Sequence, residues 1–304
     1  MKTSFSKTLS LSVITLGIAL TGCRAQNNEA TDLFTSDAQA DTLESGITML
    51  QGMADDASGS SFAYQSVPSA SKFAVAEKLL FSTAEAANCG RAVSQVCNVG
   101  FKSITYSGCQ IGSAFNLSGD VTLTYSNNSC DLSIGENVVR TYEHTISGPR
   151  GGAIQTTSDL RSDYRGTQIG GGGRLTRTGA NEWTAEILGK HKVGTRGGRT
   201  LFDVSVKTSS PIAISGALGR SGRTVNSGVL EVNHNRAGFT ALYSVVTGQP
   251  LVWNSSCAHP VSGQLAVSYS GSINGSGTVT FTGCGIAQLS KDGSARTLSI
   301  GYAE

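Results

Sequence analysis

The sequence predicts an α+β protein that is mainly β, in which a tether and two helices precede a large antiparallel β-meander with disulfides. Apolar and polar residues alternate with a period of two over most of the chain after residue 97. Glycine is abundant, with 38 residues, and only 14% of residues are charged, a composition typical of strands joined by many turns. Such a meander forms a sandwich or an open barrel, and the sequence leaves both open.

The first 22 residues have the layout of a secretory signal peptide. Lys2 and Lys7 form a short positive region, and residues 9–20 form an apolar run without charge. A membrane-spanning helix needs roughly 20 apolar residues, so this run is too short to cross a bilayer permanently. Its length is that of the apolar region of a cleaved signal.

The segment Leu20-Thr21-Gly22-Cys23 follows this run and resembles the lipobox of bacterial lipoproteins. The resemblance covers the leader alone. It implies cleavage before Cys23, lipidation of that cysteine and attachment to a membrane, because two or more acyl chains anchor a protein stably. It also favours the outer membrane, since Arg24 stands where many lipoproteins retained in the inner membrane carry aspartate.

Residues 23–36 are polar and are predicted to form the tether, and residues 37–90 are predicted to form a helical segment. Ser36 is of a type that caps helices, and an apolar stripe at helical spacing follows it. The stripe consists of Leu43, Ile47, Leu50 and Met53. A second helix is predicted over residues 71–87, and both helices are expected to pack on the sheet that follows.

Residues 91–304 are predicted to form the antiparallel β-domain. In the clearest strand, residues 182–193, Ala185 and Ile187 share one face while Glu182 and Glu186 share the other. This alternation indicates a strand with one buried face. Similar alternation is found at residues 119–126, 201–208, 228–235, 239–246, 264–270, 277–283 and 296–302.

Six cysteines remain after Cys23, and an even number in an exported chain predicts three disulfides. They are Cys89, Cys97, Cys109, Cys130, Cys257 and Cys284. Fifteen pairings are open to six cysteines. Pairing of sequence neighbours is preferred here, which gives 89–97, 109–130 and 257–284. No two cysteines form a CxxC motif, so the spacing indicates no zinc site and no redox pair.

The sequence contains no recognisable catalytic or cofactor motif. No serine has glycine at both −2 and +2, and HExxH, P-loop and GxGxxG patterns are missing. His191 lies on the apolar face of its strand, and His234 is interpreted in the same way, as a core residue. Cys257-Ala258-His259 could indicate a metal site, but a disulfide explains Cys257 more simply. The sequence therefore predicts no metal, no cofactor and no enzyme.

Charge is distributed unevenly along the chain. Residues 24–90 contain three basic and nine acidic residues, whereas residues 140–240 contain fourteen basic and seven acidic residues. The basic part is rich in arginine, whose planar group pairs with carboxylates and phosphates. Four arginines are predicted to bind anions such as envelope polymers: Arg161, Arg165, Arg174 and Arg177. The alternative is that these side chains are solvated strand faces.

Three functions follow from these patterns. The first is a non-catalytic binding or structural module, anchored to the cell envelope and contacting anionic polymers or another envelope protein. The second is a lipid-handling protein with an open β-barrel, and the third is a hydrolase with an unrecognised site. Nucleic acid is not an expected partner, because the leader directs the chain out of the cytoplasm.

Overall fold

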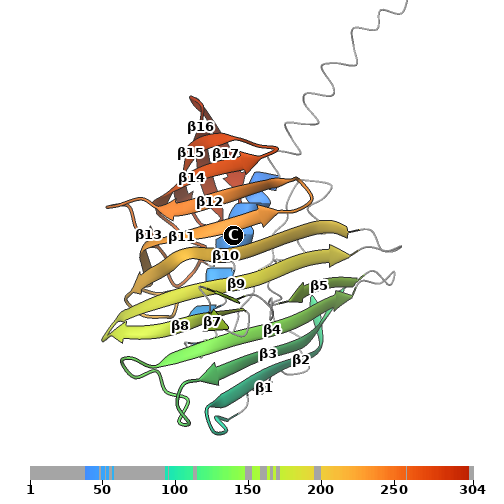
Figure 1. Cartoon of the computed structure of the whole chain (residues 1–304), viewed down its shortest axis with the longest axis vertical. Helices are drawn as coiled ribbons and strands as arrows, with labels where there is room; N and C mark the ends of the chain where they lie inside the picture. The colour runs from blue at the N-terminus through green and yellow to red at the C-terminus, as the bar shows by residue number, and fades with distance from the viewer. Residues whose placement is uncertain are drawn as a thin grey trace, which may run out of the picture.

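The computed structural model describes one helix, residues 38–57, and a β-domain, residues 93–300 (Figure 1). Gaps fall at residues 48, 52, 55–56, 95, 112–114, 148–152, 158–162, 165–166, 169–171, 195–199 and 258. The predicted signal peptide, the tether and the second helix at residues 71–87 lie outside the described residues. No helix in the described part is both long and apolar enough to span a membrane.

In the described part of the chain, fifteen strands form one antiparallel sheet. Thirteen of them follow one another in the order β1-β2-β3-β4-β5-β9-β10-β11-β12-β14-β15-β16-β17, while β8 pairs with β4 and β9, and β13 pairs with β11. The strands on one side of the sheet are β1 (Val93–Ser94), β2 (Phe101–Ile111), β3 (Phe115–Tyr125), β4 (Asn137–Ser147), β5 (Ala153–Thr157), β8 (Gly172–Gly179) and β9 (Glu182–Gly194). The others are β10 (Thr200–Ser215), β11 (Thr224–His234), β12 (Phe239–Val245), β13 (Leu251–Val252), β14 (Gly263–Gly271), β15 (Gly275–Gly283), β16 (Ile286–Lys291) and β17 (Ser294–Ser299).

The predicted mainly-β fold is confirmed, and each of the eight predicted strand segments falls on a strand of this sheet. In β9, Ala185 and Ile187 are fully buried, and Glu182 on the opposite face is exposed. The sequence leaves a sandwich and an open barrel as alternatives, and the structure decides part of this choice. The described strands form one open sheet, which is closer to the open barrel than to a sandwich.

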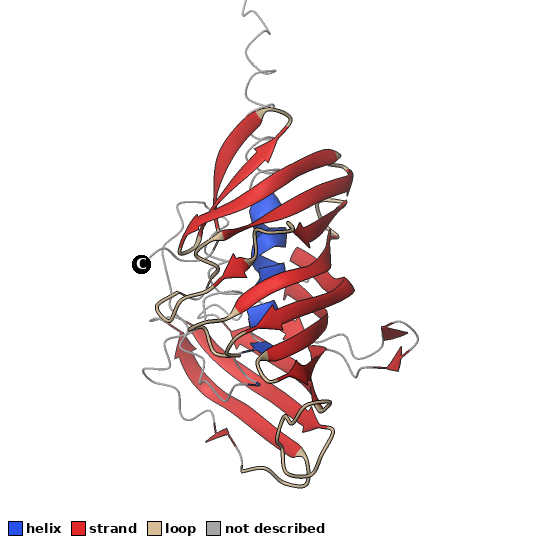
Figure 2. Cartoon of the chain, turned by 90° about the vertical axis from the view of Figure 1, so that its left-hand side faces the viewer, coloured by secondary structure: helices blue, strands red, loops and turns tan. Residues whose placement is uncertain are grey.

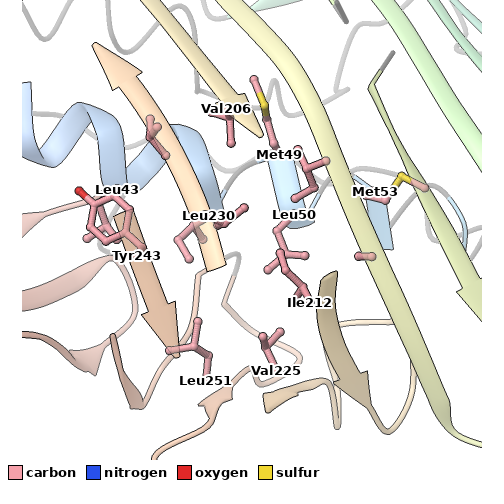
Figure 3. Packing of buried hydrophobic residues seen from close by; sticks show 14 of the residues in the cluster. Leu43, Met49, Leu50, Met53, Val206, Ile212, Val225, Leu230, Tyr243 and Leu251 are labelled. Atoms are coloured by element: carbon pink, nitrogen blue, oxygen red, sulfur yellow. The ribbon is translucent and has the colours of Figure 1, made fainter. Parts of the chain in front are cut away.

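The sheet curves around the helix of residues 38–57, which lies against its concave face (Figure 2). The predicted apolar stripe of the helix is confirmed as core, because Leu43, Ile47, Leu50 and Met53 are each 1% exposed. Figure 3 shows Leu43, Leu50 and Met53 among the buried residues. Polar residues on other sides of the helix are buried as well, including Thr42. A helix buried on all sides belongs to the interior of a protein rather than to its surface.

Side chains from the helix and from β4 fill the space over a glycine in β9. A Cβ atom at Gly189 would lie 2.8 Å from the Met49 sulfur and 2.8 Å from the Tyr142 hydroxyl. These separations are shorter than van der Waals contact, so a larger residue at position 189 would require the Met49 and Tyr142 side chains to move. Glycine therefore leaves room for these two side chains between helix and sheet.

Strands β5 and β8 occupy the same position in the sheet, between β4 and β9. Between β5 and β8 in the chain, β6 (Asp163–Tyr164) and β7 (Thr167–Gln168) form a separate two-stranded sheet. Figure 2 shows these two strands on the side of the main sheet that faces away from the helix. They therefore take no part in covering the concave face.

Two disulfides are described, Cys97–Cys130 and Cys257–Cys284. The second confirms the predicted pairing 257–284. The first shows that the predicted pairings 89–97 and 109–130 are wrong. Strands β2 and β3 are antiparallel, so the start of β2 meets the end of β3, and the Cα atoms of Cys97 and Cys130 lie 5.8 Å apart. If all six cysteines pair, Cys89 joins Cys109; Cys89 lies outside the described residues.

We predict that Ile47→Ala lowers the free energy of unfolding by about 2–5 kcal/mol, because it leaves a cavity between the helix and the sheet. Urea denaturation followed by circular dichroism measures the change. Ser268→Ala, at an exposed position of β14, is the matched control and is expected to change stability by less than about 0.5 kcal/mol. Equal, small effects of both substitutions would show that the helix is not part of the cooperative core.

Candidate functional site

A pocket of about 280 Å³ lies where the first turn of the helix meets the last strands of the sheet. Its lining combines an apolar floor with polar and charged side chains. The lining residues are Gln39, Ile273, Leu289, Lys291, Asp292, Ser294 and Arg296. Within the described residues, this pocket brings a group of ionisable side chains together around an apolar surface, and it is the candidate functional site.

Strand alternation explains how the β16–β17 hairpin contributes to this pocket. Leu289 pairs with Arg296 and Lys291 pairs with Ser294, so these four side chains stand on the same, concave face. The turn between them is Asp292-Gly293, and both residues have positive φ, 52° and 76°. An Asp-Gly pair is favoured in such a turn, and its tight geometry places Lys291 and Ser294 side by side at the mouth of the pocket.

The charge of the pocket is positive by one unit. Lys291 forms an ion pair with Asp292, with the Nζ and Oδ2 atoms 3.2 Å apart. Arg296 adds the second positive charge and is only partly exposed. Burial raises the pKa of the neighbouring Tyr269 to about 12, and the positive charge of Arg296 offsets part of that rise. The pocket therefore presents a partly desolvated guanidinium beside the fully buried Leu289.

Buried hydrogen bonds hold the helix end that forms the inner wall of the pocket. The Thr42 hydroxyl donates to the carbonyl oxygen of Gln39 at 2.9 Å and lies 2.8 Å from the Tyr243 hydroxyl. Tyr243 also donates to the Gln39 carbonyl, at 3.4 Å. Burial raises the pKa of Tyr243 well above its usual value, so the hydroxyl stays protonated and the bonds persist at physiological pH.

His234 and Asp41 form a second buried link between helix and sheet. The Nε2 atom of His234 lies 3.5 Å from Oδ2 of Asp41, and its Nδ1 atom accepts the main-chain N–H of Ala237 at 3.0 Å. The ring also stacks on Phe239, with centroids 5.6 Å apart. Both ring nitrogens are thus engaged within the fold, and His234 acts as a core residue, as its strand position predicts.

The structure separates the predicted anion-binding arginines. Arg174 and Arg177 both lie on β8, but three positions apart, so they stand on opposite faces of the sheet. Arg161 and Arg165 lie outside the described residues. Strand parity therefore puts Arg174 and Arg177 on separate surfaces of the sheet.

Both described arginines have structural contacts. Arg174 lies 3.8 Å from the Glu186 carboxylate. Arg177 donates from Nε to Gly179, from Nη1 to Leu132 and from Nη2 to Ala180, in each case to the carbonyl oxygen. These bonds hold two loops at the end of β8. Arg177 therefore fixes main chain. That Arg174 and Arg177 bind anions stays a prediction.

Sequence reasoning missed the residues that line the pocket. The Asp-Gly pair between two alternating segments is a hairpin signal, and its flanking Lys291 and Arg296 could have been placed on one face from that signal alone. Gln39 carries no such signal. It comes from the helix near the start of the chain, and only tertiary packing brings it to the hairpin.

His259 lies near the opposite end of strands β14, β15 and β16 from the pocket, beside the Cys257–Cys284 disulfide. Its main-chain N–H donates to the sulfur of Cys257 at 3.3 Å, and the residue is 7% exposed. The sulfur of Cys257 is engaged in the disulfide. Among the described residues, no three histidine, cysteine or carboxylate side chains gather as a metal site would require.

No protein-family model, curated protein or solved structure matches this chain. Function is therefore inferred from the chemistry of the pocket. A guanidinium and an ammonium beside a small apolar floor suit an anion that carries a short apolar group.

We predict that His259 makes the protein less stable in weak acid. Burial first, and the charge of Arg220 second, lower the pKa of His259 from 6.5 to about 4. Between these pH values the unfolded chain binds a proton that the folded chain does not. The free energy of unfolding therefore falls by about 3 kcal/mol as pH falls from 6.5 to 4 and stays level below that.

The measurement is urea denaturation of the wild type and of His259→Phe over this pH range. Phenylalanine does not titrate, so the variant is expected to lose this part of the pH dependence. Identical slopes for the two proteins would contradict the buried, neutral state of the imidazole.

Proposed function

We propose that this protein is a non-catalytic binding module, anchored to the bacterial cell envelope by lipid on Cys23. The lipobox-like segment 20–23 supports the anchor. The pocket at the helix end supports the binding role, because it presents charge and apolar surface together. Burial of the helix on the concave face also supports it, since a lipid held there would have to displace the helix.

The ligand proposed for the pocket is a small amphipathic anion. Arg296 offers a planar fork of donors that matches a carboxylate, and Lys291 adds a second positive charge. Ile273 is partly exposed beside the fully buried Leu289 and supplies apolar surface for a short aliphatic group. The volume of about 280 Å³ is nearly twice that of a cavity of roughly 150 Å³ that holds benzene, so the pocket accommodates about ten non-hydrogen atoms or the end of a larger molecule. Arg296 is the single residue on which this proposal depends most.

We predict that butyrate binds to the pocket and that Arg296→Gln weakens its binding about tenfold or more, because a hydrogen bond between charged groups is lost. Titration of ¹⁵N-labelled protein, followed by amide chemical shifts, measures the affinity. The affected amides are expected to be those of β16, β17 and the turn between them. Butylammonium, which also has four carbons but carries the opposite charge, is expected not to bind.

The control variant is Lys207→Gln, which removes a positive charge from β10, where Lys207 pairs with Glu231 at 3.0 Å. It is expected to leave the butyrate affinity unchanged. Equal binding of butyrate and butylammonium, or full affinity in Arg296→Gln, would rule out the pocket as an anion site.

We predict that Cys23→Ser abolishes fatty-acid labelling of the protein and moves it from the membrane fraction to the soluble fraction. The reason is that serine provides no thiol for the acyl groups that anchor the chain. Labelling in bacterial cells with a radioactive fatty acid measures the first effect. Gly22→Ala keeps a small residue before the cysteine and is expected to be labelled normally. A Cys23→Ser variant that still carries label would exclude this anchor.

A further inference from the structure

The side-chain amide of Gln39, in the lining of the pocket, has no hydrogen-bond partner among the described residues. Gln39 is 1% exposed, and its side-chain oxygen, Oε1, is buried without a donor. Its main-chain carbonyl, by contrast, accepts hydrogen bonds from both Thr42 and Tyr243. Buried polar groups in native proteins almost always have a partner, and one without a partner costs stability. The described fold therefore satisfies the main chain of Gln39 and leaves its side-chain oxygen unpaired.

The position of Gln39 indicates where a partner for this oxygen would come from. The residue lines the pocket together with Leu289 and Arg296. Because Gln39 is almost fully buried, the pocket is the side from which a small molecule can approach its amide. The two bonds to its carbonyl hold the start of the helix, so binding requires no rearrangement of main chain there. A site held in this way loses little conformational entropy when a ligand binds.

The polar groups at the mouth of the pocket are less able to select a ligand. Asp292 forms an ion pair with Lys291, and its side chain is 72% exposed. Ser294 is exposed as well. Water competes with a ligand for exposed groups, whereas a buried amide that meets no ligand group stays unpaired. A hydrogen bond to Gln39 therefore contributes more to selectivity than one to Asp292 or Ser294.

A hydroxyl group suits the amide of Gln39 better than a second charge does. A hydroxyl both donates and accepts, so it pairs with Oε1, or with Nε2 when the carboxamide is turned over. An ammonium group would add positive charge to a pocket that already contains Lys291 and Arg296. A second carboxylate has no proton to donate to Oε1. The chemistry of the pocket therefore favours a neutral hydroxyl on the bound anion.

We propose that the pocket selects a hydroxycarboxylate, whose carboxylate pairs with Arg296 and whose hydroxyl pairs with the side chain of Gln39. This inference rests on the anion site proposed above and names the class of its ligand. Gln39 is then the residue that determines specificity, because an anion without a hydroxyl leaves its amide unpaired. The volume of about 280 Å³ is large enough for a hydroxybutyrate.

The test compares butyrate with the isomeric hydroxybutyrates, which differ only in the position of the hydroxyl, by titration of ¹⁵N-labelled protein. At least one isomer is expected to bind about fivefold more tightly than butyrate, the gain from one added hydrogen bond. It is also expected to shift the side-chain NH₂ signals of Gln39. Gln39→Leu has a similar volume and no hydrogen-bonding group, so the ratio of the two affinities is expected to fall to about one.

The matched control is Gln51→Leu, the same substitution on the same helix. Gln51 lies about 18 Å further along the helix axis than Gln39, away from the pocket. It is 6% exposed and has an interaction partner in the fold. Gln51→Leu is expected to keep the affinity ratio of the wild type.

Stability without ligand separates a binding role of Gln39 from a structural one. Gln39→Leu removes a buried acceptor that has no described partner, so we expect a higher denaturation midpoint than that of the wild type. Gln51→Leu breaks an existing interaction and is expected to lower the midpoint. A lower midpoint for Gln39→Leu would show that its amide supports the fold, and the proposal would fail.

The remaining outcomes distinguish this proposal from the anion site on which it rests. If butyrate binds and no hydroxybutyrate binds more tightly, the anion site stands and selection by Gln39 is wrong. If Gln39→Leu keeps the preference for a hydroxybutyrate, a different residue recognises the hydroxyl and the proposal is wrong. If neither butyrate nor any isomer binds, both proposals fail together.

Discussion

Burial of the helix of residues 38–57 against the concave face of the open sheet is the interaction on which the rest of the structure depends. A curved, single-layered sheet has an apolar inner face that needs a covering layer, and here the helix provides it. Leu43, Ile47 and Leu50 supply the apolar contact, and the Thr42–Tyr243 and Asp41–His234 links fix the helix along its axis. These contacts join residues about 200 positions apart in the chain, so the helix cannot complete them before β11 and β12 are in place.

The same burial also positions the candidate site. The first turn of the helix closes the pocket from behind, and Gln39 reaches it because buried hydrogen bonds fix the helix at that end. The pocket also needs the β16–β17 hairpin, whose Asp292-Gly293 turn places Lys291 and Ser294 side by side.

Local patterns in the sequence predict the helix and the strands. Long-range packing determines which residues of these elements meet in space. The alternation in residues 182–193 predicted both the strand and its buried face, and the stripe ending at Met53 predicted the inner helix. The cysteine pairing failed because sequence neighbours were preferred, whereas antiparallel strands bring the start of β2 to the end of β3. Arg174 and Arg177 are three positions apart in a strand, and this spacing alone places them on opposite faces.

Hydrogen–deuterium exchange of the helix amides, followed by mass spectrometry of the natively folded protein, tests the burial of the helix most directly. Amides in a core element exchange only when the whole domain unfolds. We therefore predict that amides of residues 39–54 exchange as slowly as those of β9, β10 and β11, and that urea accelerates all of them together. Rapid exchange of the helix while these strands stay protected would contradict this burial. That result would show a helix that leaves the concave face readily, as a lipid-handling protein requires.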